Sequence, residues 1–290
     1  MAAKRIWTLS GQTWKEMLSR VLQQIKKDDI FGRAAQLSYY FLLALFPLLL
    51  FLLTLLGYFA EAGSQLRSGL IRYLGTIMPS SALELVHRTI DEISTGKGGG
   101  KLSFGLLAAL WAASNGMTAI TETLNVAYDL EETRPWWKVR LASVALTIML
   151  ALMIVLALAT VLLGSRVAYL IAAAIDFGNT FVIVWKILQW PIVLIFLLVT
   201  FGLIYYFAPN LPSRKWYWVT PGSVTAVTLW LLASFAFRMY LHFFNTYKVT
   251  YGSLGALIVL MLWFYFTGAA ILIGGEVNAE IEWSQRKHST

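Results

Sequence analysis

Six long apolar stretches run through this sequence of 290 residues. Each is long enough to cross the hydrocarbon core of a bilayer as a helix, which takes about 20 apolar residues. Unbroken apolar runs do not suit barrel strands, in which lipid-facing and lumen-facing residues alternate, so helices are the spanning structure that remains. The sequence therefore predicts an all-α, polytopic membrane protein with six transmembrane helices, at residues 34–60, 102–127, 141–164, 180–207, 218–244 and 253–281.

The composition also favours a membrane protein. Hydrophobic residues make up 58% of the chain and charged residues 13%, whereas a soluble domain carries about 25% charged residues. Too little polar surface remains to cover a soluble globule. The chain has no cysteine, which excludes disulfides and thiolate metal sites, and its three histidines are scattered. We therefore predict no metal site and no cofactor.

The basic residues predict the orientation of the spans. They are concentrated in residues 1–33, in the loop 129–140, in the loop after the fourth span and in the C-terminal tail. The side of the membrane with more Lys and Arg is cytoplasmic, and an even number of spans then places both termini there. This orientation explains the net charge of +8. We expect membrane lipids and further copies of the chain as partners, and no nucleic acid.

The predicted domains are a cytoplasmic amphipathic arm at residues 1–32, the six-helix domain at 33–282 and a cytoplasmic tail at 283–290. Apolar residues recur at helical spacing in the arm, with lysines and arginines between them. The arm is either an interfacial helix lying flat on the membrane or a helix packed on the protein's own cytoplasmic surface. The outer segment 61–101 predicts a helical loop, which is either a lid over a vestibule or a helical hairpin on the membrane.

Polar residues in the first span are candidates for a substrate path. Gln36, Tyr39 and Tyr40 precede Pro47 in this span. A proline in a helix interior removes a backbone hydrogen bond and kinks the helix, and polar side chains beside a kink can line a cavity. The alternative is a kink that only improves packing.

The second span carries a polar stripe. Asn115 and Glu122 are seven residues apart and share a helix face, and Asn125 follows toward the cytoplasmic end. A buried polar stripe inside a membrane marks a substrate path by default. The alternative is that these side chains only form hydrogen bonds between helices.

Ionisable residues in the last two spans complete the candidate path. Arg238 in the fifth span either extends to the interface, pairs with an acidic group or receives an anion. Glu276 and Glu280, with Asn278 between them, lie one turn apart at the end of the sixth span. Two adjacent carboxylates can exchange protons or a cation, and the alternative is a solvated helix end.

Enzyme signatures are missing from the sequence. It contains no phosphate-binding glycine loop, no nucleophile elbow and no metal-ligand motif. We therefore predict no catalytic residue, and we do not expect an enzyme.

Several motifs in order resemble one family of bacterial membrane proteins. They are Ala34-Ala35-x-Leu37-x-Tyr39-Tyr40 with Leu45-Phe46-Pro47, Trp111-Ala112-Ala113-Ser114 with Leu124-Asn125-x-x-Tyr128, Tyr251-Gly252-Ser253-Leu254-Gly255-Ala256, and Gly275-Glu276-Val277-Asn278-Ala279-Glu280. This series resembles the YihY/BrkB family and covers residues 28 to 282. Ala44 departs from the pattern, because the family often has a small hydroxyl residue at this position.

The resemblance implies a six-helix protein of the bacterial inner membrane. Members were once labelled as ribonuclease BN, which is regarded as a misassignment, and some are linked to the export or flipping of lipid or amphiphilic cargo. The polar stripe of the second span, Arg238 and the proline kink of the first span motivate the first hypothesis, a transporter or flippase for a lipid or another amphiphilic anionic substrate. The alternative is a non-transporting scaffold that organises the cell envelope, and a membrane ribonuclease is the least favoured reading.

Overall fold

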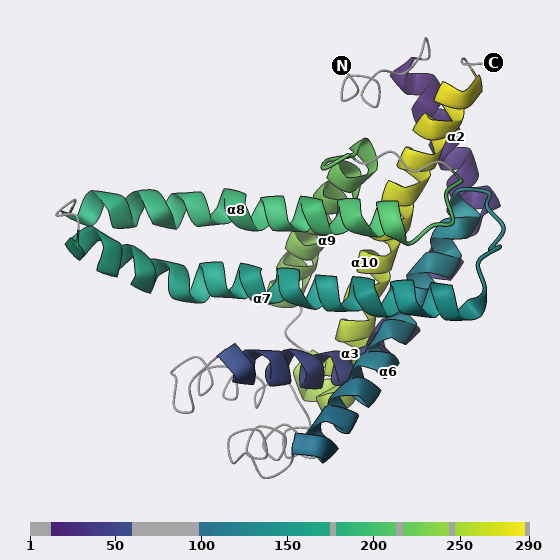
Figure 1. Cartoon of the computed structure of the whole chain (residues 1–290). Helices are drawn as coiled ribbons and strands as arrows, with labels where there is room; N and C mark the ends of the chain where they lie inside the picture. Colours follow the sequence, from purple (N-terminus) through teal and green to yellow (C-terminus); the bar gives the residue numbers. More distant parts are fainter. Residues whose placement is uncertain (1–12, 60–98, 175–177, 213–216, 244–246, 288–290) are drawn as a thin grey trace. The chain divides into compact units, whose positions relative to one another are not determined.

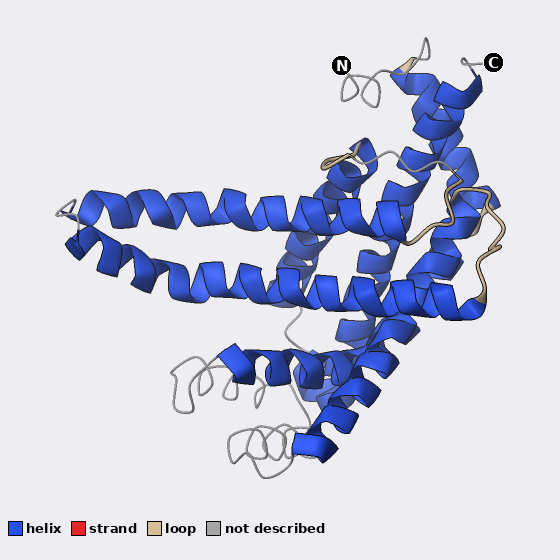
Figure 2. Ribbon diagram, viewed as in Figure 1, coloured by secondary structure: helices blue, strands red, loops and turns tan. Residues whose placement is uncertain are grey.

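The computed structural model describes residues 13–59, 99–174, 178–212, 217–243 and 247–287, and every regular element within these ranges is an α-helix (Figures 1 and 2). The helices are α2 (Trp14–Lys27), α3 (Ile30–Phe59), α6 (Gly99–Ala127), α7 (Trp136–Ala174), α8 (Gly178–Phe207), α9 (Pro221–Phe243) and α10 (Tyr247–Lys287). The all-α prediction is confirmed for this part of the chain. Each predicted span falls on one of the six helices other than α2.

Four of these helices contain a segment that is long and apolar enough to cross a membrane. The segments are Trp136–Val161, Val182–Phe207, Pro221–Tyr240 and Leu257–Gln285. The protein is therefore a multi-pass membrane protein. The two other predicted spans fall on α3 and α6, which have 30 and 29 residues. Part of their side chains lies outside the described residues, and the six-span topology stays a prediction.

Two helices extend into the predicted outer loop and the predicted tail. The helical outer loop lies outside the described residues except for its last three positions, which belong to α6 because this helix already begins at Gly99. The predicted tail at 283–290 is helical as far as Lys287. No glycine or proline follows Gly275 to stop α10, so the helix continues beyond its apolar part. Pro47 lies inside α3, and the helix continues past it.

The chain divides into two compact units. One consists of residues 1–44, 114–146 and 198–290, and the other consists of residues 45–113 and 147–197. In the second unit, Ala151 of α7 and Val182 and Gln189 of α8 are buried. The first unit contains α2, α9 and α10 entirely, and the candidate site described below lies within it.

Helix α10 forms the centre of the first unit and packs against α9 and α2. The start of α3 approaches it so closely that a Cβ atom on Gly268 would lie 3.3 Å from the backbone oxygen of Ala34. From α8, the Tyr205 hydroxyl donates a hydrogen bond to the Ile271 carbonyl at 2.7 Å. The side chains of Leu272 in α10 and Leu124 in α6 are completely buried.

The arm helix α2 has one buried face and one exposed face. Met17, Val21 and Ile25 recur every four residues and are buried, and α2 packs on α10. Leu18 and Leu22, on the other side, are more than half exposed, at 59% and 53%. This packing favours the interpretation that the arm lies on the protein's own surface, with a second apolar stripe left uncovered.

Candidate functional site

Two helix ends meet where the candidate site lies. Asp29 follows the C-terminal cap of α2 with a φ of 49°, and Asp129 follows the end of α6 with the same φ of 49°. Aspartate tolerates this left-handed conformation better than most residues. The Asp29 carboxylate also accepts the Gly32 N–H at 3.3 Å in the first turn of α3. Lys27 Nζ contacts Asp129 Oδ1 at 3.3 Å on the exposed surface, so the ends of α2 and α6 are linked.

Glycines bring α10 close to its neighbours at this level. A Cβ atom on Gly275 would lie 2.6 Å from Leu124 Cδ2 of α6. A Cβ atom on Gly274 would lie 2.6 Å from the backbone oxygen of Gly222 in α9. Small residues permit such close approach between membrane helices. The next residue, Glu276, is consequently enclosed, with an exposed fraction of 1%.

Glu276 faces a second acidic residue, Asp28, which caps the C-terminus of α2 and is 8% exposed. The two carboxyl groups lie within hydrogen-bond reach of each other. One oxygen of each, Asp28 Oδ2 and Glu276 Oε1, has no hydrogen-bond partner among the described residues. Burial raises the pKa of Asp28 above its ordinary value. Arg33 contacts Asp28 through the backbone, because its Nε donates to the Asp28 carbonyl at 2.8 Å.

Glu280 has a different partner. Its Oε1 contacts Arg20 Nη1 of α2 at 3.3 Å, and the Glu280 side chain is 8% exposed. The Arg20 guanidinium also lies 5.3 Å from the centre of the Trp283 ring, a cation–π contact. The interpretation of Glu276 and Glu280 as a solvated helix end is therefore wrong, because both residues are buried. The predicted pairing of these two carboxylates is replaced by one acidic and one basic partner, both from the arm helix.

Asn278 lies two residues after Glu276 on α10, and its side chain contacts the start of α9. Its Oδ1 accepts the Gly222 N–H at 2.8 Å, and its Nδ2 donates to Thr220 Oγ1 at 3.0 Å. Asn278 also forms a side-chain hydrogen bond with Tyr128, whose pKa is raised well above its usual range by burial. Asn278 thus joins α9, α10 and the end of α6.

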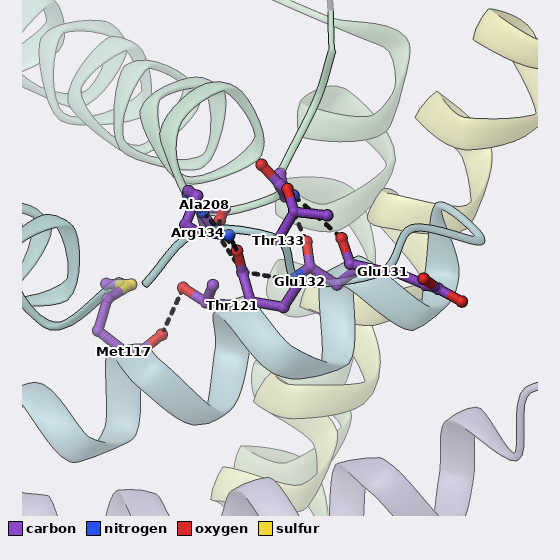
Figure 3. A network of polar contacts seen from close by, with 9 residues as sticks. Met117, Thr121, Glu131, Glu132, Thr133, Arg134 and Ala208 are labelled. Atoms are coloured by element: carbon purple, nitrogen blue, oxygen red, sulfur yellow. Dashed lines mark hydrogen bonds and ion pairs between the residues drawn. The ribbon is translucent and has the colours of Figure 1, made fainter. Parts of the chain in front are cut away.

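Asn125 is the centre of a polar network that joins two loops. Figure 3 shows part of this network, with Glu132, Arg134 and Ala208 labelled. The asparagine is buried, its Nδ2 donates to Glu132 Oε2 at 2.8 Å, and its Oδ1 accepts the Asn210 N–H at 2.7 Å. Arg134 contacts Glu132 at 2.6 Å and donates to the Ala208 carbonyl at 3.0 Å. Its ion pair with Arg134 lowers the pKa of Glu132. This network fixes the α6–α7 loop on the α8–α9 loop.

The polar stripe predicted for the second span is divided by the structure. Asn125 is buried, whereas Asn115 and Glu122 are exposed. Asn115 Oδ1 accepts a hydrogen bond from Arg140 Nη1 of α7 at 2.7 Å, and the same nitrogen lies 3.4 Å from Thr118 Oγ1. The stripe is not a continuous buried path, because the face shared by Asn115 and Glu122 points outward.

The remaining candidates do not join the buried cluster. Gln36, Tyr39 and Arg238 are exposed, and Tyr40 is half-buried. Arg238 forms no ion pair with a residue of the described ranges, which leaves an extended side chain at the interface as its simplest reading. The substrate-path role of these residues, and of Pro47, stays a prediction.

Sequence reasoning missed Asp28, Glu132, Asn210 and Arg140. The doublet Asp28-Asp29 at the end of an otherwise basic arm was an available signal for the first of these residues. Glu132 and Asn210 lie in loops, where no helical period indicates which side chains face inward. Arg140 lies near the start of α7, in the basic segment 129–140 that predicts the orientation of the spans.

The fold and the site define the class of this protein as a multi-pass α-helical membrane protein with a buried carboxyl pair at one end of its helices. The chain belongs to the Virulence factor BrkB family, whose model matches residues 21–290. The resemblance to the YihY/BrkB family is thereby confirmed.

Curated relatives cover most of the chain. The ribonuclease-like protein YfkH of Bacillus subtilis is 40% identical over 248 residues, which are 86% of this chain and 88% of the relative. A UPF0761 membrane protein of Vibrio parahaemolyticus is 29% identical over an alignment of 283 residues that covers 91% of this chain and 83% of the relative. No solved structure matches.

Proposed function

We propose that this protein is a transporter or flippase that moves a lipid or another amphiphilic anionic substrate across the bacterial inner membrane, with both termini in the cytoplasm. The proposal is carried by Glu276, a buried carboxyl group within a segment that can span the membrane. An ionisable side chain in such a place is costly and usually marks a transport path. One oxygen of Glu276 has no hydrogen-bond partner in the described part of the chain.

The start of α7 supports an anionic substrate. Trp136 and Trp137 are exposed, at 74% and 52%, as expected for tryptophans at the level of lipid headgroups. Arg140 follows about one turn later and shares a hydrogen bond with the exposed Asn115. A guanidinium at headgroup level forms strong, charge-assisted hydrogen bonds with phosphate or carboxylate groups.

Transbilayer movement of labelled lipids in proteoliposomes tests the proposal. We expect anionic lipids to cross faster than in empty liposomes, and Arg140→Gln to slow anionic lipids more than zwitterionic ones. Glu131→Gln is the matched control, because Glu131 is exposed in the α6–α7 loop. No movement above empty liposomes, across several headgroups, would refute a flippase.

A scaffold in the cell envelope is the second candidate. It is favoured by the close approach of α10 to its neighbours at Gly274 and Gly275 and by the network that holds two loops together through Asn125. Such junctions suit a rigid framework. A scaffold predicts no lipid movement by the purified protein, together with an altered envelope in cells that lack it.

RNA cleavage is suggested by the name of the ribonuclease-like Bacillus relative and by the former ribonuclease BN label of the family. We do not propose it for this chain, because the sequence contains no catalytic motif. Incubation of the purified protein with RNA, with and without divalent metal, tests it directly.

A further inference from the structure

We propose that Asp28 and Glu276 form a proton-binding site that holds one proton between the two carboxyl groups and couples proton movement to transport. The coupling role rests on the proposed function, whereas proton binding does not. The site lies between the end of the arm helix α2 and the last helix α10. Binding or release of the proton therefore affects the contact between these two helices.

Burial is the first argument. Glu276 is 1% exposed and Asp28 is 8% exposed, and the carboxyl groups lie within hydrogen-bond reach. Two carboxylates at this separation repel each other, and a buried site offers little water to screen them. A single proton between them removes one charge and forms a hydrogen bond between the groups.

The second argument is that the nearby cations are engaged elsewhere. Lys27 contacts Asp129 at 3.3 Å, on the exposed surface. Arg33 donates to the backbone carbonyl of Asp28, at 2.8 Å. Among the residues that the structure describes, neither Asp28 nor Glu276 forms an ion pair. The unpaired oxygens Asp28 Oδ2 and Glu276 Oε1 are thus left to a ligand that the described residues do not supply.

A proton suits these two groups better than a metal cation. Hard cations such as Ca²⁺ and Mg²⁺ take about six or more oxygen ligands. The described residues contain no group of three or more His, Asp or Glu side chains that could hold a metal ion. Two carboxyl groups are sufficient for a proton.

The groups around the pair define its proton affinity. Burial and the charge of Asp129 raise the pKa of Asp28, whereas Lys27, Arg33 and the hydrogen bond with Glu276 lower it. Further titratable groups lie nearby: Tyr128 bonds to Asn278, and the buried Tyr205 of α8 donates to a backbone carbonyl. Glu280 follows Glu276 by one turn on α10 and is paired with Arg20 of α2.

Release of the proton changes the charge of the site by one. The bound state carries one proton and one negative charge, and release gives H⁺ to water and leaves two carboxylates. The exposed pair of Lys27 and Asp129 lies next to Asp28, so the proton leaves through this end. The new negative charge attracts Lys27 away from Asp129, which loosens the link between α2 and α6.

Infrared spectroscopy of the full-length protein in liposomes tests proton binding. At neutral pH we expect a carboxylic acid band that Glu276→Gln and Asp28→Asn each remove or shift and that Glu131→Gln leaves unchanged. An absent band in the unchanged protein, or a band unaffected by either substitution, overturns the proposal. Loss of the band when sodium replaces a bulky organic cation at constant pH also overturns it, because the site would then bind sodium.

A pH gradient across the same liposomes tests coupling. We expect the gradient to accelerate movement of an anionic labelled lipid several-fold, and Glu276→Gln and Asp28→Asn to abolish this acceleration. Lipid movement that ignores the gradient in the unchanged protein overturns the coupling. If no lipid moves but the infrared band behaves as expected, the transport proposal fails and the proton site stands.

Discussion

Asn278 of α10 completes the first turn of α9, since its side-chain oxygen accepts the backbone N–H of Gly222 at 2.8 Å. The first N–H groups of a helix have no partner inside the helix and must be satisfied from outside. Thr220 satisfies another of them, because its Oγ1 accepts the Ser223 N–H at 3.0 Å. One helix therefore depends on a side chain of the next for its N-terminal cap, and α9 and α10 are expected to fold together.

Asn278→Ala is expected to destabilise the protein. The substitution leaves the buried Gly222 N–H without an acceptor, which costs about 1–3 kcal/mol. Thermal unfolding in detergent micelles, followed by circular dichroism, measures the change. Gln23→Ala is the control, because Gln23 is exposed on α2 and the substitution should change the unfolding midpoint little. Equal midpoints for Asn278→Ala and the unchanged protein would contradict the capping role.

Gly274→Ala is expected to be more harmful than Gly275→Ala. A Cβ atom at Gly274 meets the Gly222 backbone oxygen at 2.6 Å and Ala226 Cβ at 2.8 Å, and neither can rotate away. At Gly275 it meets only the flexible end of Leu124 at comparable distance. Overpacking costs about 1–3 kcal/mol, while alanine gains about 1 kcal/mol over glycine in a helix interior. We expect a clear fall of the unfolding midpoint for Gly274→Ala and a smaller change for Gly275→Ala, and the reverse order would disprove the packing argument.

The helices could be predicted because long apolar runs in a membrane protein must form helices, which fixes where each helix lies. The predicted span 180–207 corresponds to α8 at Gly178–Phe207, and 218–244 corresponds to α9 at Pro221–Phe243. Helix α7 extends well beyond its predicted span 141–164, to Trp136–Ala174. An apolar run predicts the part of a helix that lies in the hydrocarbon core, whereas the helix itself can continue into the more polar residues on either side.

The buried carboxyl pair could not be predicted in the same way. Glu276 and Glu280 are one turn apart and were natural partners for each other, but α2 lies along this part of α10 and supplies Asp28 to one and Arg20 to the other. That docking depends on tertiary packing of Met17, Val21 and Ile25, and a helical period does not reveal which surface it will meet. Likewise, sequence spacing placed Asn115 and Glu122 on one face without showing that the face is exposed.

Glu132 should make stability fall in acid. Its ion pair with Arg134 lowers its pKa from the ordinary value of 4.5, so the folded state holds a proton less tightly than the unfolded state. This contribution is complete above that value and is lost as the pH falls through the lowered pKa of the folded protein. We expect Glu132→Gln to be less stable than the unchanged protein at neutral pH, with a difference that shrinks in acid. Thermal unfolding midpoints of both proteins, measured from neutral pH into acid, test whether the difference shrinks as expected, with Glu131→Gln as the control.

Asp28 should make the stability of the protein fall as the pH rises, which is opposite to the effect of Glu132. Its pKa is raised from 3.8, mainly by burial, so the folded state binds a proton more tightly than the unfolded state. The stability that it contributes is complete below 3.8 and is lost as the pH rises through the raised pKa. Asp28→Asn is therefore expected to raise the unfolding midpoint at alkaline pH. Asp29→Asn is the matched control, because Asn keeps both the left-handed backbone and the cap of α3. A midpoint lowered at alkaline pH by Asp28→Asn would contradict the assignment.

Arg20 should anchor the arm helix to α10. Removing it leaves Glu280 buried and without its cation, and breaking a buried pair on one side costs up to about 3–5 kcal/mol. The Arg20 side chain is 38% exposed, so we expect a smaller loss, together with faster hydrogen exchange of the α2 amides in Arg20→Ala. Adding Glu280→Gln to Arg20→Ala should restore part of the lost stability, because the stranded charge disappears. Lys15→Ala, which removes an exposed cation from the same helix, is the control. If the double variant were as unstable as the sum of the single ones, the contact would carry no coupling and α2 would be held by its apolar face alone.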